Sequence, residues 1–225
     1  MISLSDRLLD RAVDRRALLI TGGASPSRAL IAQGQAAAAF TMCADSGAAS
    51  LVRLGLWPDM IVGDMDSLAP EVLAQLKDRD CESIILPVEK DFTDTQAALE
   101  WLFQHDYQEV LVLGGTGSRW DHSTANYFLV TGYGRQGQSV VMWDEKNAMR
   151  YIAGHSYQVP ASNHQLSLVP TSDEGVELSL TGLYYGLDSA QVPCGQSLLI
   201  SNEFVGPEAT VTISRGDAWL FVSCD

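Results

Sequence analysis

The chain has little positive charge and no long apolar run. Its 14 Lys and Arg residues face 28 Asp and Glu residues, which gives a formal net charge of −14. A surface this acidic repels nucleic-acid phosphates, so we expect no nucleic-acid partner. No stretch approaches the ~18 consecutive apolar residues of a membrane helix, so we expect no membrane span. Residues 1–7 contain both charge signs and no apolar core, which predicts no secretion signal and a cytoplasmic location.

Paired cysteines, internal repeats and low-complexity tracts are also missing. Cys43, Cys81, Cys194 and Cys224 form no Cys-x-x-Cys pair, so neither a zinc site nor a redox motif is predicted. Without an export signal, we expect these cysteines to be reduced and mostly buried in the core. Acidic side chains are what the sequence has in abundance. An acidic protein can bind a nucleotide through a bridging cation, and Mg²⁺ suits that role.

Up to about residue 145, apolar strand-like runs alternate with stretches of helical spacing. The expected strands are Ala17–Thr21, Phe40–Ala44, Met60–Val62, Ser83–Leu86, Val110–Leu113 and Ser139–Trp143. The helical spacing is clearest in Thr93–Gln104 and Ser123–Tyr133. This alternation predicts an α/β domain over residues 1–146, with a parallel sheet covered by helices on both faces.

After residue 146 the pattern changes to short strand-like runs separated by Gly, Pro, Asn and Asp. The expected strands are Tyr151–Ile152, Gln165–Val169, Val176–Leu180, Ser197–Ile200, Thr210–Ile213 and Trp219–Val222. No stretch in this part has helical periodicity. The pattern predicts a C-terminal antiparallel β-sandwich over residues 147–225.

Aspartates gather in the loops that follow the predicted parallel strands. Open parallel sheets bind ligands at the carboxyl ends of their strands, so these loops are the candidate site. Asp64 and Asp66 are two apart, and in an extended loop their carboxylates point the same way and repel unless a cation lies between them. With Asp91 and Asp94 on a neighbouring loop, four carboxylates suit Mg²⁺. The alternative is that they are ordinary turn residues, with Asp94 as a helix N-cap.

A glycine-rich loop, Gly114–Gly117, follows one predicted strand and precedes a helix. Its backbone N–H groups can approach phosphate oxygens, and the start of a helix favours negative charge. The loop is neither a Walker A motif nor a Gly-x-Gly-x-x-Gly fingerprint, so alone it is a weak signal. Gly22-Gly23, after the first strand, is typical of a plain tight turn.

Few cations lie near these loops. Lys90, Arg119 and Arg28 are the candidates for neutralising phosphate oxygens, and Arg119 is favoured because a guanidinium binds phosphate through two hydrogen bonds. Arg119 and Asp121 are equally compatible with an ordinary surface ion pair. We expect His122 to be a polar residue at the start of a helix without a catalytic role.

Four motifs, in this order and spacing, resemble the thiamine pyrophosphokinase family. They are Ala44-Asp45-Ser46-Gly47-Ala48, Pro58–Ser67, Lys90-Asp91-Phe92-Thr93-Asp94 and Gly114–His122. The match covers most of the first domain. It extends more loosely into the second at Ser167–Pro170, Thr181–Leu183 and Ser201–Glu203.

The resemblance implies transfer of a diphosphate group from ATP to the hydroxyl of thiamine, giving thiamine diphosphate and AMP. It also implies a homodimer, with thiamine between one subunit's α/β domain and the other subunit's β domain. The metal and catalytic residues would be Asp64, Asp66, Asp91 and Asp94. The residues at ATP and its phosphates would be Asp45, Lys90, Thr93, Gly114, Gly115, Gly117, Arg119 and Asp121. The thiamine contacts would be Ser201 and Asn202, with Trp219 nearby. Asp91, Asp94 and Asp45 remain candidates for the base that takes the alcohol proton.

Two residues depart from the family pattern. Ser46 stands where the family has glycine, and we expect a backbone cost there if the position needs positive φ. Met65 replaces an aromatic residue, with little expected effect because methionine is a tolerant filler.

Three other functions remain open from the sequence. The nearest is a related diphosphokinase for another alcohol, such as a hydroxymethyl pterin, because its α/β motifs would look alike. The second is a nucleotide-binding protein without turnover, which has no need for four like charges in one place. The third, a purely structural acidic protein, leaves the gathering of acids at loop ends unexplained.

Overall fold

The computed structural model describes residue 8 and residues 13–224 of the chain. The expectation about a secretion signal concerns residues 1–7, which lie outside the described residues. In the described part, no helix is long and apolar enough to cross a membrane. The elements in chain order are β1 (Arg16–Ile20), α1 (Arg28–Ala37), β2 (Phe40–Ala44), α2 (Gly47–Val52), β3 (Met60–Gly63), α3 (Pro70–Lys77), β4 (Glu82–Ile85), α4 (Asp94–Gln104), β5 (Glu109–Leu113), α5 (Trp120–Arg135), β6 (Ser139–Trp143), β7 (Asn147–Ala153), β8 (Ser156–Pro160), β9 (Gln165–Pro170), β10 (Val176–Thr181), β11 (Leu187–Val192), β12 (Glu208–Arg215) and β13 (Asp217–Ser223).

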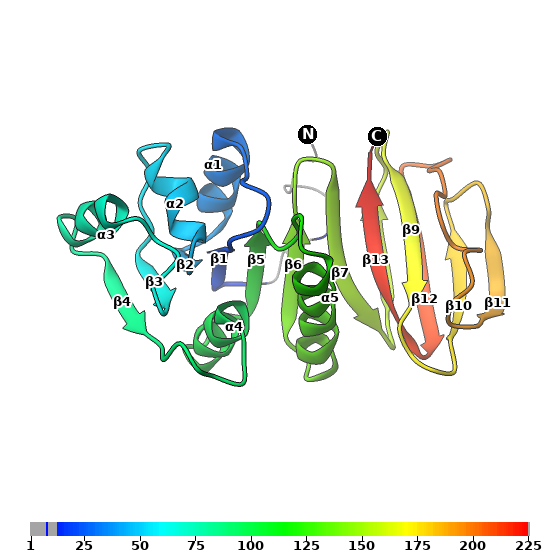
Figure 1. The fold of residues 1–225 in the computed structure, drawn as a ribbon. Coiled ribbons are helices and arrows are strands. Elements are labelled where there is room, and N and C mark those ends of the chain that lie inside the picture. The colour runs from blue at the N-terminus through cyan, green and yellow to red at the C-terminus, as the bar shows by residue number, and fades with distance from the viewer. Residues whose placement is uncertain (1–7, 9–12, 225) are drawn as a thin grey trace.

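A nine-stranded sheet runs through the molecule in the order β4-β3-β2-β1-β5-β6-β7-β13-β9 (Figure 1). Strands β1 to β6 pair in parallel, and β7, β13 and β9 extend the same sheet with antiparallel pairing. A second, four-stranded antiparallel sheet has the order β11-β10-β12-β8. The predicted combination of a parallel α/β sheet and a C-terminal antiparallel β part is therefore confirmed.

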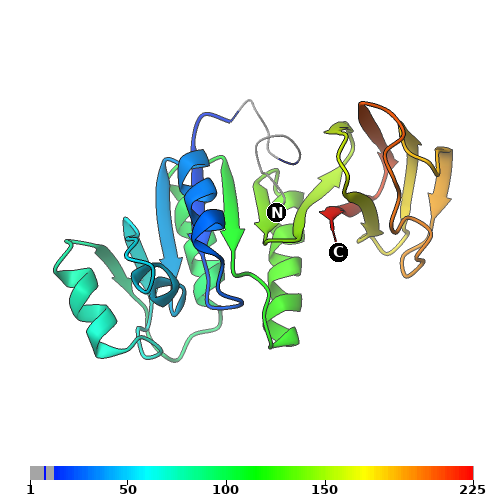
Figure 2. The same cartoon turned by 90° about the horizontal axis from the view of Figure 1, so that it is seen from above.

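Helices cover both faces of the parallel region, so its strands are buried on both sides (Figure 2). In β1, Leu18 and Ile20 face the core formed with α1, α2 and α3, and Ala17 and Leu19 face the core formed with α4 and α5. Both side-chain sets are apolar because neither face meets water. This explains why the first strand has a continuous apolar run.

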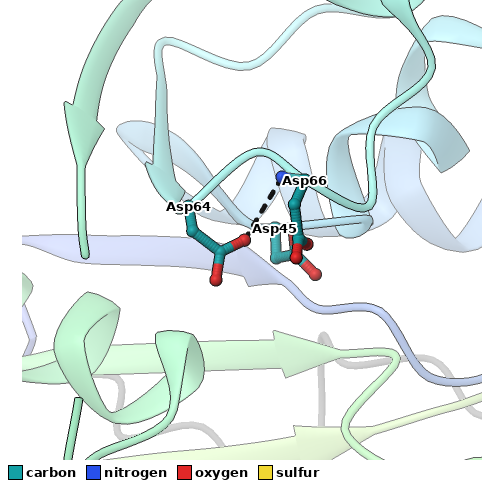
Figure 3. Close-up of side chains that lie close together, drawn as sticks. All are labelled: Asp45, Asp64 and Asp66. Carbon is teal, nitrogen blue, oxygen red and sulfur yellow. Dashed lines mark hydrogen bonds between the residues drawn. The ribbon is translucent and has the colours of Figure 1, made fainter. Parts of the chain in front are cut away.

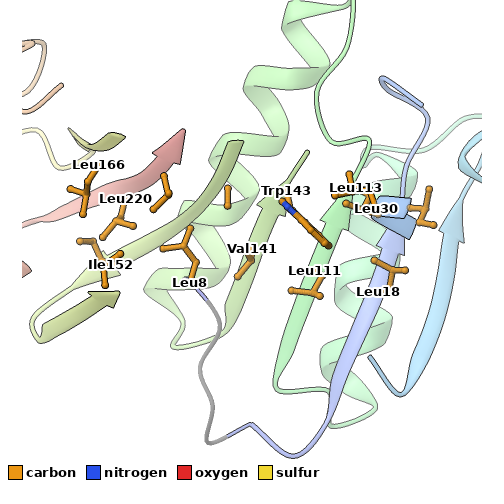
Figure 4. Packing of buried hydrophobic residues seen from close by; sticks show 14 of the residues in the cluster. Leu8, Leu18, Leu30, Leu111, Leu113, Val141, Trp143, Ile152, Leu166 and Leu220 are labelled. Atoms are coloured by element: carbon orange, nitrogen blue, oxygen red, sulfur yellow. The ribbon is translucent and has the colours of Figure 1, made fainter. Parts of the chain in front are cut away.

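The first of these cores continues without a break into the β part (Figure 4). The four-stranded sheet packs over β7, β13 and β9, with Ile152, Leu166 and Leu220 buried against residues such as Leu178 and Val211. One layer of the sandwich is thus the end of the main sheet itself. Our expected domain boundary, between residues 146 and 147, falls at the start of β7, whose pairing with β6 joins the two parts. The boundary stays a prediction.

One predicted strand is wrong and two strands were not predicted. The predicted strand at residues 197–200 is a turn segment instead. Of its apolar residues only Leu199 is buried, and its carbonyl oxygen accepts a hydrogen bond from Leu168 N, whereas Leu198 is 63% exposed. Strands β8 and β11 lie at the edges of the smaller sheet. Half of an edge strand faces water, so their mixed polar sequences lack the apolar signal that marks a buried strand.

Candidate active site

The strand order reverses direction at β1, which lies between β2 and β5. Ligands of open α/β sheets bind beyond the carboxyl ends of the strands at such a point. Two glycine loops meet there, because Gly23 N donates to Gly114 O at 2.9 Å and Ala24 N donates to Thr116 O at 2.6 Å. A Cβ atom on Gly23 would lie 2.2 Å from Gly114 O, so only glycine permits this contact. Gly22-Gly23 is therefore more than the plain tight turn that we expected.

The second glycine loop leaves backbone donors free. Gly117 N is bound by Ser123 Oγ at 3.1 Å, and Asn126 Nδ2 holds Gly115 O at 2.7 Å. Within the described chain, no residue accepts a hydrogen bond from the N–H of Thr116 or Ser118. Helix α5 starts directly after this loop, so the positive end of its dipole adds to the attraction for an anion.

These loops form one wall of a cleft of about 750 Å³. The rest of the lining includes residues 88, 90 and 92–95, around the start of α4. The lining residues are Thr21, Gly22, Gly23, Ala24, Ala44, Asp45, Ser46, Val88, Lys90, Phe92, Thr93, Asp94, Thr95, Gly114, Gly115, Thr116, Gly117, Ser118, Arg119, His122, Ser123 and Asn126. A second groove, of about 500 Å³ between α4 and α5, has Glu100 as its one charged lining residue and offers no comparable chemistry. The cleft fits a ligand with phosphates because the backbone of the glycine loop and two cations, Lys90 and Arg119, line it.

Three carboxylates converge beside the cleft: Asp45, Asp64 and Asp66 (Figure 3). One oxygen from each lies within 4.8 Å of the others. The turn between them is tight, since Asp66 N donates to Asp64 Oδ1 at 3.2 Å and Ser67 Oγ donates to Asp45 Oδ1. Asp45 has a φ of +46°, a left-handed conformation that aspartate tolerates better than most residues. Asp45, which the family resemblance places with the phosphates, thus joins two of the expected metal ligands.

The pKa values in this cluster move in opposite directions. A hydrogen bond from Lys90 lowers the pKa of Asp64, helped by the bond from Asp66 N. The hydrogen bond and negative charge of Asp64 raise the pKa of Asp66. The cluster thus holds more negative charge than Lys90 offsets. Oxygen ligands with uncompensated charge fit a hard divalent cation such as Mg²⁺.

Lys90 connects the cluster to α4. Its Nζ lies 3.1 Å from Asp64 Oδ2 and 3.3 Å from Asp94 Oδ1, and its side chain is only 8% exposed. The contact with Asp94 is an ion pair without hydrogen-bond alignment, so Asp94 Oδ1 accepts no hydrogen bond from the described residues. Burial raises the pKa of Asp94 despite the nearby ammonium.

The two expected aspartate pairs do not form one group of four. Asp94 reaches Asp64 through Lys90, but Asp91 is exposed and lies outside both the carboxylate cluster and the cleft lining. The alternative role for Asp94 is also wrong, because Thr93 is the N-cap of α4 and its Oγ1 accepts a bond from Gln96 N at 3.2 Å.

The two remaining candidate cations, Arg119 and Arg28, differ in position, because only Arg119 lines the cleft. Arg119 lines the cleft and also pairs with Asp121, with Nη2–Oδ2 at 2.5 Å and Nε–Oδ1 at 3.2 Å. The guanidinium lowers the pKa of Asp121 to about 2. Both side chains are about two-thirds exposed (67% and 64%), so the pair is weak and can open to a phosphate at little cost. Arg28 instead donates to Leu54 O at 2.6 Å and does not line the cleft.

Ser46 shows no backbone cost. Its φ is −60°, an ordinary helical value, and the positive φ falls on the preceding residue, Asp45. The condition on which we expected a backbone cost, a positive φ at this position, is therefore not met. Met65 has a φ of +64° and is 9% exposed, and packs into the core.

The three thiamine candidates lie outside the cleft lining. Asn202 is 4% exposed, and its amide is bound by the backbone of Tyr185 and Glu203 in three hydrogen bonds of 2.9–3.0 Å. The indole of Trp219 donates to Thr131 Oγ1 at 2.7 Å and packs on the α5 side of the sheet. Ser201 is exposed beside Asn202, with a φ of +60°. Of the three side chains, the Ser201 hydroxyl is therefore the one available to a ligand, because the polar groups of Asn202 and Trp219 already make hydrogen bonds within the protein.

Both parts of the chain match thiamin pyrophosphokinase sequences. Residues 32–142 match the family "Thiamin pyrophosphokinase, catalytic domain", and residues 155–217 match "Thiamin pyrophosphokinase, vitamin B1 binding domain". A thiamine pyrophosphokinase of Bacillus subtilis is 26% identical over 183 residues, which cover 80% of this chain and 86% of that protein.

Solved structures show the same likeness. A thiamin pyrophosphokinase family protein of Enterococcus faecalis superposes with a TM-score of 0.81 at 30% identity, covering 93% of this chain and 99% of that one. The Bacillus subtilis enzyme superposes with a TM-score of 0.85 at 24% identity, covering 94% and 100% of the two chains. At that identity the second comparison supports the fold alone.

Proposed function

The chain belongs to the thiamin pyrophosphokinase family, and we propose that it transfers a diphosphate group from ATP to the primary hydroxyl of thiamine, releasing AMP. The observation that carries this proposal is the cleft itself. Carboxylates that suit Mg²⁺ lie beside it, and the glycine loop that lines it includes Thr116, which, like Ser118 next to it, has an N–H group with no acceptor among the described residues.

We assign the metal to Asp45, Asp64 and Asp66. When bound there, Mg²⁺ would neutralise charge on the phosphate oxygens. The chain's own donors complete the site: the loop Gly114–Gly117 and Arg119 lie where they can bind the polyphosphate. Lys90 would help to offset the negative charge of the phosphates and carboxylates. Asp121 would hold the guanidinium of Arg119 in place before the nucleotide binds. Thr93, at the start of α4, faces the same cleft.

The reaction needs one bond formed and one broken. The thiamine oxygen attacks the β-phosphorus of ATP, the bond from that phosphorus to the oxygen bridging the α-phosphorus breaks, and AMP leaves. The alcohol proton goes to a base. We propose Asp94 for this role because it lines the cleft, burial raises its pKa, and its Oδ1 accepts no hydrogen bond within the described structure. Asp91 does not line the cleft, and Asp45 already accepts a bond from Ser67.

We further propose a cytoplasmic homodimer whose active sites combine the cleft of one subunit with the β part of the other. Support comes from large apolar side chains on the β part that are exposed in the single chain: Tyr184 at 68%, Tyr185 and Val205 at 63% each, Leu198 at 63% and Ile200 at 44%. Ser201 follows this group directly and would face thiamine, while Asn202 would hold the loop through Tyr185. Burial of such a group against a second copy would remove apolar area from water.

The decisive experiment is mass spectrometry of the products from ATP, Mg²⁺ and thiamine. We expect thiamine diphosphate and AMP in equal amounts, and none of either when Mg²⁺ or thiamine is left out. A hydroxymethyl pterin in place of thiamine should give no product. Thiamine monophosphate with ADP would contradict transfer of a diphosphate, and binding of ATP without any product would identify a nucleotide-binding protein.

A further inference from the structure

Ser46 places its hydroxyl in a notch that only glycine at position 22 leaves open. A Cβ atom on Gly22 would lie 2.1 Å from Ser46 Oγ. Both residues line the cleft, and Ser46 directly follows Asp45 in the chain. The hydroxyl therefore lies against the first glycine loop, on the residue next to a proposed metal ligand.

This hydroxyl has no partner within the part of the chain that the structure describes. It does not cap α2, whose N-cap position it occupies, and no described residue forms a hydrogen bond with it. The neighbouring hydroxyls differ: Ser67 is bound to Asp45, and Ser25 is bound to Ser50 at 3.2 Å. A partly buried hydroxyl without a protein partner is available to donate to a ligand in the cleft.

We propose that Ser46 Oγ donates a hydrogen bond to a non-bridging oxygen of the β- or γ-phosphate of ATP and so positions the diphosphate group for transfer. The chemistry favours a phosphate over the nucleoside, because Ser46 follows the proposed metal ligand Asp45 and shares the cleft lining with both glycine loops, and a metal and such loops both serve phosphates. This inference rests on the proposed function. The family's usual glycine cannot make this contact, so the role belongs to this chain.

Calorimetric titration of the full-length protein with ATP and Mg²⁺, and separately with AMP, tests the proposal. Ser46→Ala should weaken ATP binding roughly 10- to 150-fold, as expected for a lost hydrogen bond to a charged group, and leave AMP binding unchanged. Ser25→Ala is the matched control and should change neither. Equal loss for ATP and AMP, or no loss for ATP, would overturn the proposal. If the wild-type protein itself binds no ATP, it is the proposed function that fails.

Gly22→Ala provides a second test that does not remove the hydroxyl. The added methyl group should push the short serine side chain to another rotamer, so ATP binding should fall by a similar factor with little change in Tm. In the Ser46→Ala background the same change should cost less than about 2-fold, because no hydroxyl remains to displace. Equal losses in both backgrounds would show that Gly22 does not act through Ser46.

Discussion

The position of each carboxylate in the cleft is fixed by a backbone conformation rather than by its neighbours in sequence. Asp45 takes a φ of +46° at the end of β2, and Asp45 N donates to Val62 O at 2.8 Å. Gly63 has a φ of +148°, and a Cβ there would lie 3.3 Å from the backbone of Asp45. The loops after β2 and β3 can therefore bring Asp45 close to Asp64 and Asp66, because Gly63 has no side chain where the two loops touch.

Removing one charge from this cluster tests the metal assignment. Asp64→Asn keeps the shape of the side chain but removes the charge that Mg²⁺ and Lys90 both use. We expect kcat to fall by on the order of 100-fold or more, with Tm nearly unchanged. Steady-state assays over a range of Mg²⁺ concentrations measure the change, and exposed Asp78→Asn is the control. Wild-type activity of Asp64→Asn at limiting Mg²⁺ would refute the assignment.

A second residue-scale prediction concerns pH. Burial by itself would raise the pKa of Asp217, but hydrogen bonds from Arg135, Thr171 and Tyr151 outweigh it and hold the pKa below its usual value. A carboxylate with a depressed folded pKa stabilises the fold above its unfolded pKa of about 3.9. The contribution is lost as the pH falls through the folded value.

Arg135→Gln should therefore lower the free energy of unfolding by about 1–2 kcal/mol at pH 7, a figure reduced because the Arg135 side chain is 51% exposed. The difference from wild type should shrink as the pH falls below about 4. Urea unfolding at several pH values measures it. Arg215→Gln breaks an exposed pair with Glu174 and should cost less than about 0.5 kcal/mol at any pH. A cost for Arg135→Gln that does not depend on pH would contradict the role of Asp217.

At the scale of elements, α5 connects the phosphate loop to the β part. It begins directly after the glycine loop, and its last turn is fixed to β7 and β13. Arg135 pairs with Asp217 of β13, and Thr131 accepts a bond from Trp219. Gly134 lets the ring of Tyr151 from β7 lie against the helix backbone. The helix therefore holds both parts of the molecule in one arrangement.

Two glycines on α5 give a matched pair of predictions. A methyl group at Gly134 would lie 2.3 Å from Tyr151 Cδ1, and the ring cannot easily retreat because its hydroxyl is bound to Asp217. Gly134→Ala should therefore destabilise the protein by about 1–3 kcal/mol. A methyl group at Gly132 meets nothing within 4 Å, so Gly132→Ala should stabilise it by about 0.5–1 kcal/mol. Urea unfolding measures both, and equal effects would show that Tyr151 yields freely.

At the scale of the whole molecule, the proposed dimer predicts a measurable mass. Light scattering at micromolar concentration should give twice the 24.4 kDa of the chain. Leu198→Glu puts a charge among the exposed apolar side chains and should shift the protein to monomers, while exposed Gln191→Glu should not. A monomeric wild-type protein would exclude the shared active site.

Mixing two inactive variants tests whether the site is shared between subunits. Asp64→Asn disables the cleft, and Ser201→Arg places a positive charge where the thiazolium cation of thiamine is proposed to bind. After unfolding and refolding of an equal mixture, half of the dimers carry one of each variant, and one of their two sites is intact. Activity should recover to about a quarter of wild type. No recovery from a mixture that does form dimers would place both residues in the same subunit's site.

The sequence alone determined the buried strands and the kinds of residue that follow them. Strands β2 and β6 have the predicted bounds, because buried parallel strands require continuous apolar runs whatever surrounds them. The acids, glycines and few cations after those strands identified the family and predict a phosphate site. These features are local, so a linear pattern records them.

Tertiary structure decided which of those residues meet. Strand order places the loops after β2 and β3 side by side, so Asp45 joins Asp64 and Asp66 while Asp91 stays outside. The extension of the main sheet by β7, β13 and β9 and the burial of Asn202 also depend on pairing between distant segments. Periodicity reports which face of an element is buried and is silent on which element covers it, and that is why these contacts needed the fold.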